Sequence, residues 1–197
     1  MQSVILVRHG ETEFNVRGAL NGDVTIACGL TAAGLEQARR LREALRDEPL
    51  DLCVTSEFER AQATADEVLR GREVPRLVLA ELNDPLYGPF EGGQLEDYRG
   101  WAQGASSRDV PGADGESRYA IVDRYARAFR SLLGRPEKAI LVVSHSLPVS
   151  YALGARDGLV PQARVRMAGN ATPYRFTATE FEQATELLET WLAAPTW

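Results

Sequence analysis

The chain has 197 residues, of which 44% are hydrophobic and 25% charged, which is the composition of an ordinary globular protein of about one domain's length. This composition excludes a disordered chain, a collagen-like chain and a small disulfide-stapled protein. The formal net charge of −6 argues against a general affinity for nucleic acid or for anionic membranes, because such binding needs clustered positive charge.

The hydrophobic pattern predicts a cytoplasmic protein. No run reaches the roughly 18 apolar residues of a transmembrane helix. The N-terminal apolar run, Val4 to Val7, is too short for a secretory signal and follows no basic residue. Cys28 and Cys53 match no metal-binding spacing, so we expect two thiols that pack in the interior. We expect one domain over residues 1–197, and the sequence leaves open whether it forms a homo-oligomer.

In the first half of the chain, strand patterns alternate with helix patterns. Val4 to Val7 is typical of a buried strand, and it opens at Arg8 into a polar loop that reaches about Gly29. The next expected elements are a helix over 31–46, a strand over 52–54, a helix over 58–69 and a strand over 77–79. Ser56 and Glu59 have the spacing of a capping box and predict the start of the second of these helices.

The second half contains one region without a clear period. Proline, glycine and aromatic residues are spread over 81–115, and we interpret about 85–115 as an inserted cap or substrate loop with room for one helical turn. A helix over 116–133, a strand over 139–143 and a short helix after Ser146 are expected next. The tail is ambiguous, because residues 174–181 alternate like a strand while the apolar residues from 181 to 191 have helical spacing.

The alternation indicates an α/β fold, a three-layer sandwich with a mostly parallel central sheet flanked by helices. In such sheets, ligands bind beyond the carboxyl ends of the strands. Three strands are followed there by polar residues, namely Arg8 and His9, then Thr55, Ser56 and Arg60, and then Ser144, His145 and Ser146. We therefore expect these side chains to converge on one crevice.

A cluster of arginines and histidines favours a phosphoryl group as its ligand, because arginine offers planar pairs of donors to phosphoryl oxygens. Taken singly, His9 and His145 are typical structural histidines and the arginines typical of surface ion pairs. Both histidines directly follow apolar strands, however, which favours a site. Two histidines without a close pair of acidic ligands make a poor zinc or magnesium site, so we expect no metal and no cofactor. Lys138, the single lysine, lacks the glycine-rich approach of a nucleotide-binding phosphate loop.

The segment Leu6-Val7-Arg8-His9-Gly10-Glu11-Thr12 resembles the signature of the histidine phosphatase superfamily, also called the phosphoglycerate mutase-like family. Further matches follow in the family's order: Asn15, Asn21-Gly22, Leu30 to Gly34, Thr55-Ser56 with Arg60, Tyr87-Gly88 with Phe90-Glu91-Gly92, Gly115-Glu116-Ser117 and Val142 to Ser146. The resemblance implies a phosphoglycerate mutase-like fold whose tail returns as an antiparallel hairpin.

The resemblance also implies roles for individual residues. His9 would accept the phosphoryl group as a phosphohistidine, and Arg8, Arg60 and His145 would hold the phosphoryl oxygens. Other residues implied to line the pocket are Asn15, Asn21 and Gly22, with Ser146 offering a backbone N–H. The family usually has glutamate as general acid, whereas this chain has Asp84 at that position, and Glu81 and Glu91 are the alternative proton donors.

The function expected from these residues is that of a metal-independent phosphomonoesterase acting on a small phosphorylated substrate. One alternative is a phosphoglycerate mutase, which Asn83 before the acid favours. Mutases carry a longer insertion with basic residues for the substrate carboxylate, and the candidates Arg99, Arg108 and Arg118 are scattered here. The other alternative is a phosphate-binding regulatory protein with little turnover.

The spacing of the possible catalytic residues does not fit two other classes of hydrolase. A cysteine phosphatase needs five residues between its cysteine and arginine, and six separate Cys53 from Arg60. A serine hydrolase needs a glycine-flanked nucleophile with a histidine later in the chain, which neither Ser144 nor Ser146 has.

Overall fold

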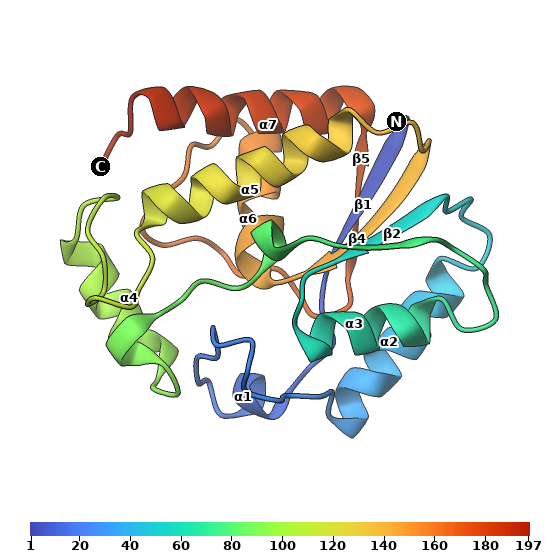
Figure 1. Cartoon of the computed structure of the whole chain (residues 1–197), viewed down its shortest axis with the longest axis horizontal. Helices are drawn as coiled ribbons and strands as arrows, with labels where there is room; N and C mark the ends of the chain where they lie inside the picture. The colour runs from blue at the N-terminus through green and yellow to red at the C-terminus, as the bar shows by residue number, and fades with distance from the viewer.

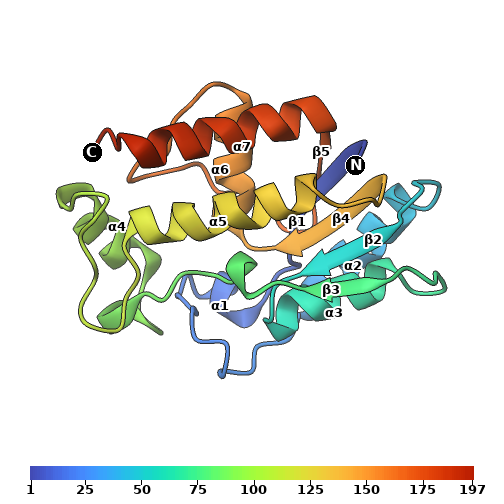
Figure 2. The same cartoon turned by 45° about the horizontal axis from the view of Figure 1, so that its top comes forward.

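A computed structural model describes all of residues 1–197 and contains one five-stranded sheet. The strands are β1 (Ser3–Arg8), β2 (Leu52–Thr55), β3 (Arg76–Val78), β4 (Ala139–Ser144) and β5 (Pro173–Thr177). They lie in the order β3-β2-β4-β1-β5, and only β5 runs antiparallel to its neighbour. The mostly parallel sheet expected from the sequence is confirmed, with β3 at one edge (Figure 2).

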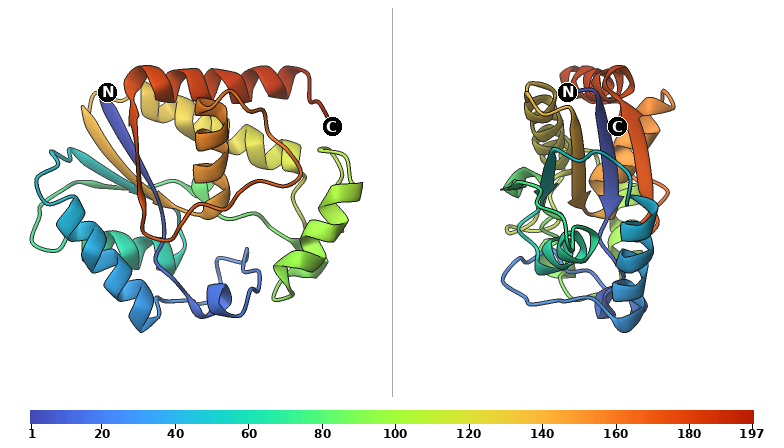
Figure 3. Two further views of the ribbon diagram at one scale, coloured as in Figure 1. Left: turned by 180° about the vertical axis from the view of Figure 1, so that it is seen from behind. Right: turned by 90° about the vertical axis from the view of Figure 1, so that its right-hand side faces the viewer.

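Helices cover both faces of the sheet (Figures 1 and 3). The helices are α1 (Glu13–Val16), α2 (Ala32–Ala44), α3 (Glu59–Val68), α4 (Leu95–Gly104), α5 (Arg118–Leu133), α6 (Ser146–Arg156) and α7 (Ala178–Ala193), with single 3-10 turns at η1 (Ala80–Leu82) and η2 (Gly88–Phe90). Because α2 and α3 pack on one face and α5, α6 and α7 on the other, the expected three-layer sandwich is confirmed.

Strand β1 shows how the sequence builds the two cores. Alternate residues of a strand point to opposite faces, and all of Val4 to Val7 is buried. Val4 and Leu6 pack with α5, α6 and α7, while Ile5 and Val7 pack with α2 and α3. A strand covered on both faces therefore has a continuous apolar run, which places it inside the sheet.

The start of α3 differs from the expectation. The helix begins at Glu59 with Phe58 as its N-cap and has no side-chain cap, so the capping box expected from Ser56 and Glu59 is wrong. The Ser56 hydroxyl is instead within 2.9 Å of His145 Nε2, and the Glu59 carboxylate accepts from the backbone N–H of Cys28 at 3.0 Å. Ser56 and Glu59 therefore bond to residues distant in the sequence and do not cap the start of α3.

The tail is a strand followed by a helix, so the hairpin that the family resemblance implied is wrong. Strand β5 ends at Thr177, and α7 begins at the next residue. Thr177 and Glu180 form a capping box there, which fixes the point of the change. Phe181, Leu188 and Trp191 are buried on one side of α7 against the core with α5 and α6, as the helical spacing indicated.

The two regions expected to be loops contain short helices. Helix α1 lies in the segment after β1 and is closed by a capping box of Thr12 and Asn15. Helix α4 runs through the segment interpreted as a cap and buries Tyr98 and Ala102 in a small separate cluster. Both helices lie beyond the carboxyl ends of the parallel strands (Figure 1). They therefore border the region where a ligand is expected.

The two cysteines and the lengths of the helices can be compared with the expectations from the sequence. Cys28 and Cys53 are both buried free thiols, as expected. None of the helices combines the length and the apolar character needed to cross a bilayer.

Candidate active site

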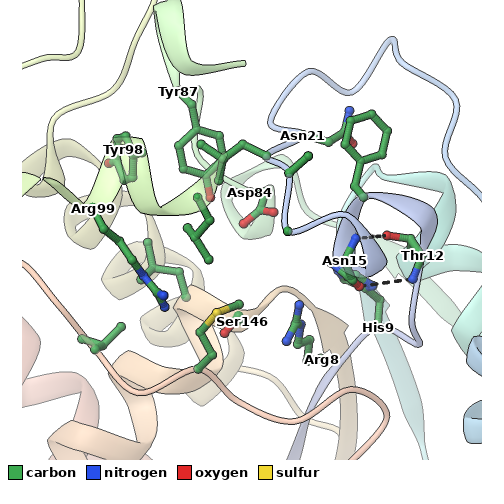
Figure 4. Close-up of a pocket in the computed structure, with 18 of the residues that line it drawn as sticks. Arg8, His9, Thr12, Asn15, Asn21, Asp84, Tyr87, Tyr98, Arg99 and Ser146 are labelled. Atoms are coloured by element: carbon green, nitrogen blue, oxygen red, sulfur yellow. Dashed lines mark hydrogen bonds between the residues drawn. The ribbon is translucent and has the colours of Figure 1, made fainter. Parts of the chain in front are cut away.

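The carboxyl ends of β1, β2 and β4 meet at one edge of the sheet. Register pairs Arg8 of β1 with Ser144 of β4, and Thr55 of β2 with Val143 of β4. Beside these strand ends, Arg8, His9, Arg60 and Ser146 line a cavity of about 360 Å³, shown in Figure 4, whereas Ser56 and His145 lie next to it without lining it. The structure thus brings together the polar clusters that the sequence placed after three separate strands.

His9 is buried at the wall of the cavity, and its two ring nitrogens have different partners. Nδ1 lies 2.7 Å from the carbonyl oxygen of Gly10, so Nδ1 carries the proton and donates it. Nε2 then carries a lone pair, which accepts a hydrogen bond from Nε of Arg60 at 3.2 Å. Burial, reinforced by the charges of Arg60 and Arg8, holds the pKa of His9 well below its ordinary value of 6.5. The imidazole is therefore neutral at neutral pH, which a nucleophile requires.

Arg60 links the parts of the site. Its guanidinium donates to the side-chain and backbone oxygens of Asn21, to His9 and to Oδ2 of Asp84, the last at 3.1 Å. Its Nη2 is also 3.3 Å from Nδ1 of His145. The side chain is only 3% exposed, so its position is fixed on all sides.

His145 is fully buried beside Arg60 and does not line the cavity. Because its Nδ1 faces the Arg60 donor, its proton is on Nε2 and is donated to the hydroxyl of Ser56 at 2.9 Å. Burial and the charge of Arg60 lower the pKa of His145 well below its ordinary value. The two imidazoles are arranged edge to face with their centres 5.3 Å apart.

Asp84 comes from the segment between η1 and η2, and its side chain lies at the cavity beside Arg60 (Figure 4). Burial raises the pKa of this carboxyl group, against the opposing charges of Arg60 and Arg8. Its Oδ2 is 3.6 Å from Nδ1 of His145. The segment that carries Asp84 is fixed by Arg124, which donates to the carbonyl oxygens of Glu81, Asn83 and Asp84 at 2.7 to 3.3 Å.

Three residues that line the cavity have a buried donor without a hydrogen-bond partner in the protein. The donors are Nε of Arg8, Nδ2 of Asn21 and Nε of Arg118. Arg8 donates elsewhere to the carbonyl oxygen of Ala168, and the oxygen of Asn21 is taken by Arg60. Buried donors rarely lack a hydrogen-bond partner, because each unpaired donor costs about 1–3 kcal/mol. The donors of Arg8 and Asn21 are available to an anionic ligand in the cavity.

The remaining residues implied by the family resemblance are placed as follows. Asn15 and Ser146 line the cavity, although the Asn15 side-chain oxygen also closes the capping box of α1. Gly22 does not line the cavity, and its N–H donates to Glu91 at 2.9 Å. A Cβ at Gly22 would lie 1.8 Å from the carbonyl oxygen of Pro85, so the close approach of two loops requires glycine there.

Sequence reasoning did not identify Asn170 as a cavity residue, and it did not place Arg118 or Arg99 at the cavity. Asn170, in the segment before β5, donates to the carbonyl oxygen of His9 at 2.8 Å and holds the backbone of that residue. No pattern in the sequence marks it. Arg118 and Arg99 are far apart in the sequence and looked scattered, but both line the cavity. Arg108 does not line it and lies over the ring of Tyr119. The signal for Arg118 was its place directly after Gly115-Glu116-Ser117.

Comparison with known proteins shows which family the chain belongs to. The family model described as "Histidine phosphatase superfamily (branch 1)" matches residues 4–192. The chain belongs to branch 1 of the histidine phosphatase superfamily. Within it, the chain is 38% identical to an adenosylcobalamin/alpha-ribazole phosphatase of Salmonella typhimurium over 149 residues, covering 71% of this chain and 72% of that protein. An Escherichia coli protein of the same name is 34% identical, with 80% of each chain covered.

A solved histidine phosphatase structure shares the fold. The alpha-ribazole phosphatase of Shigella flexneri superimposes with a TM-score of 0.70 at 28% identity, covering 86% of this chain and 96% of that one. The phosphoglycerate mutase-like family membership expected from the sequence is confirmed.

Proposed function

We propose that the protein is a phosphomonoesterase that hydrolyses its substrate through a phosphohistidine at His9. The observation that carries this proposal is the lone pair on His9 Nε2, held in place by the Nδ1 hydrogen bond to Gly10 and set beside the guanidinium groups of Arg8 and Arg60. A neutral nucleophile among fixed positive charges suits phosphoryl transfer, because the charges stabilise the equatorial oxygens in the transition state.

In the first step, Nε2 of His9 forms a bond to phosphorus while the bond from phosphorus to the ester oxygen breaks. Asp84 gives its proton to that oxygen, so the alcohol leaves in neutral form. Arg8 and Arg60 hold the transferred group, and His145, which does not line the cavity, acts through its contact with Nη2 of Arg60. In the second step, water attacks the phosphohistidine, Asp84 takes the proton from the water, and inorganic phosphate leaves with His9 restored. None of these steps needs a metal ion.

The relatives' names make alpha-ribazole phosphate the first ester to assay on this protein, beside p-nitrophenyl phosphate as a generic substrate. The trapping experiment incubates the protein briefly with a ³²P-labelled ester and then denatures it in alkali. We expect label on a peptide containing His9, stable in alkali and lost in acid. His9→Ala should carry no label and release no phosphate, and full activity in His9→Ala would overturn the proposal.

The mutase alternative gives a different result in one assay. With glycerate 3-phosphate and catalytic bisphosphoglycerate, a phosphatase releases inorganic phosphate, whereas a mutase converts the ester to its 2-phosphate isomer without release. A binding protein would retain phosphate and release none from any ester. We expect net release.

A further inference from the structure

The peptide bond between His9 and Gly10 is held at both of its polar atoms by side chains from other parts of the fold. The carbonyl oxygen of His9 accepts from Nδ2 of Asn170 at 2.8 Å, and the N–H of Gly10 donates to the hydroxyl of Thr64 at 2.9 Å. Asn170 lies in the segment between α6 and β5, whereas Thr64 lies in α3. Two parts of the chain that are far apart in the sequence therefore meet on the peptide that follows His9.

This peptide helps to determine where the acceptor for the His9 ring lies. Nδ1 of His9 donates to the carbonyl oxygen of Gly10 at 2.7 Å, and this bond leaves the lone pair on Nε2. Glycine has wide backbone freedom, so the position of its carbonyl oxygen depends on how the peptides on either side are held. The N–H of Glu11, in the far peptide, donates to Gln37 of α2 at 2.9 Å. Asn170 and Thr64 hold the near one.

Thr64 is completely buried, and its hydroxyl is used both as an acceptor and as a donor. It accepts from Gly10 and donates to the carbonyl oxygen of Arg60, one turn earlier in α3, at 2.7 Å. The guanidinium of Arg60 in turn contacts Nε2 of His9. Thr64 thus ties the backbone beside His9 to the helical turn that carries Arg60, so the two groups keep a fixed relation to each other.

Asn170 reaches His9 from a segment with a strained backbone. The next residue, Ala171, has a φ of 45° and is the only residue other than glycine with a positive φ. This conformation is unfavourable for alanine and persists only where the surrounding contacts hold it. Here the N–H of Ala171 donates to the carbonyl oxygen of Arg8 at 2.8 Å, and Nδ2 of Asn170 also donates to Oδ1 of Asn15 at 3.2 Å. The strained segment is therefore fastened to the end of β1 and to the capping box of α1 drawn in Figure 4.

We propose that Asn170 and Thr64 are positioning residues for phosphoryl transfer, which act on the His9 imidazole through the peptide between His9 and Gly10. The proposal rests on the proposed phosphomonoesterase function. Thr64 does not line the cavity, and the amide nitrogen of Asn170 donates to two protein oxygens, so neither side chain is needed to bind the phosphoryl group. Misplacing a reacting group by about 1 Å can cost about 100-fold in rate. Releasing this peptide should therefore slow the attack of Nε2 on phosphorus and leave phosphate binding to the cavity arginines unchanged.

The test measures the rate constant at which His9 becomes phosphorylated. With the protein in excess over ³²P-labelled p-nitrophenyl phosphate, the release of p-nitrophenol reports this step alone, and label on His9 after an alkaline quench shows that it takes place. A variant that only loses folded protein needs a higher protein concentration to saturate the ester and keeps the saturating rate constant. The second readout is the inhibition constant of inorganic phosphate, which depends on binding alone.

Thr64 offers a pair of variants that separate its hydroxyl from its volume. Thr64→Val keeps the shape and removes the hydroxyl, and it should lower the saturating rate constant by about 10- to 100-fold. Thr64→Ser keeps the hydroxyl and should restore most of the rate constant. The matched control is Thr185→Val in α7, because Thr185 is also completely buried and donates one turn back, to the carbonyl oxygen of Phe181 at 2.7 Å. That variant loses the same local hydrogen bond and should keep the rate constant.

Asn170→Ala removes the donor at the other end of the peptide and should lower the rate constant by a similar factor of about 10- to 100-fold. Its control is Gln162→Ala, which removes an exposed amide from the same segment. The double variant of Asn170→Ala and Thr64→Val should be about as slow as the slower single variant, because both changes release one peptide. The inhibition constant of inorganic phosphate should be nearly unchanged in all of them.

Three results would overturn the proposal. They are an unchanged saturating rate constant in either Thr64→Val or Asn170→Ala, losses that multiply in the double variant, and an inhibition constant of phosphate that rises as much as the rate constant falls. The last result would make the two residues structural parts of the phosphate site. An unaltered protein that gains no label on His9 would instead refute the proposed function.

Discussion

His9 is buried and Asp84 half-buried at one cavity, and the loss of hydration shifts their pKa values in opposite directions. It lowers the pKa of the His9 imidazole and raises that of the Asp84 carboxyl, because in each case the charged form loses its hydration. Both shifts favour the neutral form. A neutral imidazole can attack and a neutral carboxyl can donate a proton, so one physical cause prepares both groups for the first step.

The pH profile should show both groups. As pH rises, kcat/KM should increase where His9 loses its proton, below pH 6.5, and decrease where Asp84 ionises, above its ordinary value of 3.8. For a sugar or glycerol phosphate, we expect the optimum to lie between the pH at which His9 loses its proton and the pH at which Asp84 ionises. In Asp84→Asn the decrease on the alkaline side should disappear, which separates it from ionisation of the substrate. A profile with the same alkaline limb in both proteins would contradict the assignment.

The role of Asp84 as general acid also predicts a dependence on the leaving group. Protonating a poor leaving group contributes about 10²- to 10⁴-fold, whereas p-nitrophenolate needs little help. Asp84→Asn should therefore lose most of its activity on glycerol phosphate and keep much of it on p-nitrophenyl phosphate. The measurement is the ratio of kcat values for the two esters, with dephosphorylation of His9 shown not to be limiting.

Two neighbouring glutamates provide the comparison for Asp84. Glu91 accepts from the backbone N–H groups of Gly22 and Tyr87, so its carboxylate is occupied in joining two loops. Glu81 lies in η1 and is exposed. Neither Glu81→Gln nor Glu91→Gln should change the ratio of the two kcat values. If one of them did and Asp84→Asn did not, the acid would be reassigned.

At the scale of elements, α5 positions the segment that carries Asp84. Arg124 reaches from this helix to three carbonyl oxygens of residues 81–84, and its own guanidinium is paired with Glu116. Arg124→Gln should lower kcat for glycerol phosphate by about 10- to 100-fold, part of the contribution of the acid, with less effect on p-nitrophenyl phosphate. KM should change little, because Arg124 does not line the cavity. The matched control is Arg127→Gln on the same helix, whose exposed side chain pairs with Asp123. Equal losses on both esters would contradict a positioning role for Arg124.

The contact between α2 and the segment after His9 depends on Gly34. A Cβ there would lie 2.1 Å from the carbonyl oxygen of Glu11, which is backbone and cannot move aside. Gly34→Ala should destabilise the protein by about 1–3 kcal/mol and reduce activity, although alanine is the better helix former by about 1 kcal/mol. Denaturant unfolding measures the change.

Gly100 in α4 is the control for Gly34, because an added Cβ there meets nothing within 4 Å. Gly100→Ala should stabilise by about 0.5–1 kcal/mol through the helix preference alone. The same sign of change in both variants would show that the close approach at Gly34 does not matter.

The sequence predicted an element well where a single hydrophobic pattern covered the whole segment, and poorly where two patterns overlapped or where proline and glycine interrupted the pattern. The central strands β1 and β4 were predicted to within a residue or two, because burial on both faces leaves only apolar choices. Helix α4 was missed since prolines and glycines surround a short run whose buried residues pack in a cluster separate from the main core. The tail stayed ambiguous, although the capping box of Thr177 and Glu180 was visible in the sequence and would have divided strand from helix.

The site was predictable to the extent that its residues follow strands. His9 and His145 come directly after β1 and β4, so the order of elements placed them together. Asn170 and Arg118 reach the cavity from segments whose path depends on tertiary packing, and local pattern could not place them. Ser56 was assigned to a helix cap, but its hydroxyl bonds His145 because a buried imidazole N–H needs an acceptor.

At the scale of the whole molecule, a chain with a net charge of −6 concentrates positive charge in one cavity. The net negative charge of the chain repels anions in general, so binding requires the donors inside the cavity. Oxyanions that occupy the site should therefore stabilise the folded protein, since the unfolded chain offers no such cluster.

Vanadate and inorganic phosphate test this linkage. A ligand at 100 times its Kd stabilises by about 2.7 kcal/mol, which for a protein of this size raises the melting temperature by about 5–10 °C. Sodium chloride at equal ionic strength should give a much smaller change, and vanadate should inhibit phosphate release at the concentrations that stabilise. Arg60→Lys should lose most of the shift measured from its own melting temperature, because a point charge cannot reproduce the paired donors of a guanidinium. An undiminished shift in Arg60→Lys would show that the oxyanion binds elsewhere, and the phosphoryl site would then have to be sought outside the cavity beside His9.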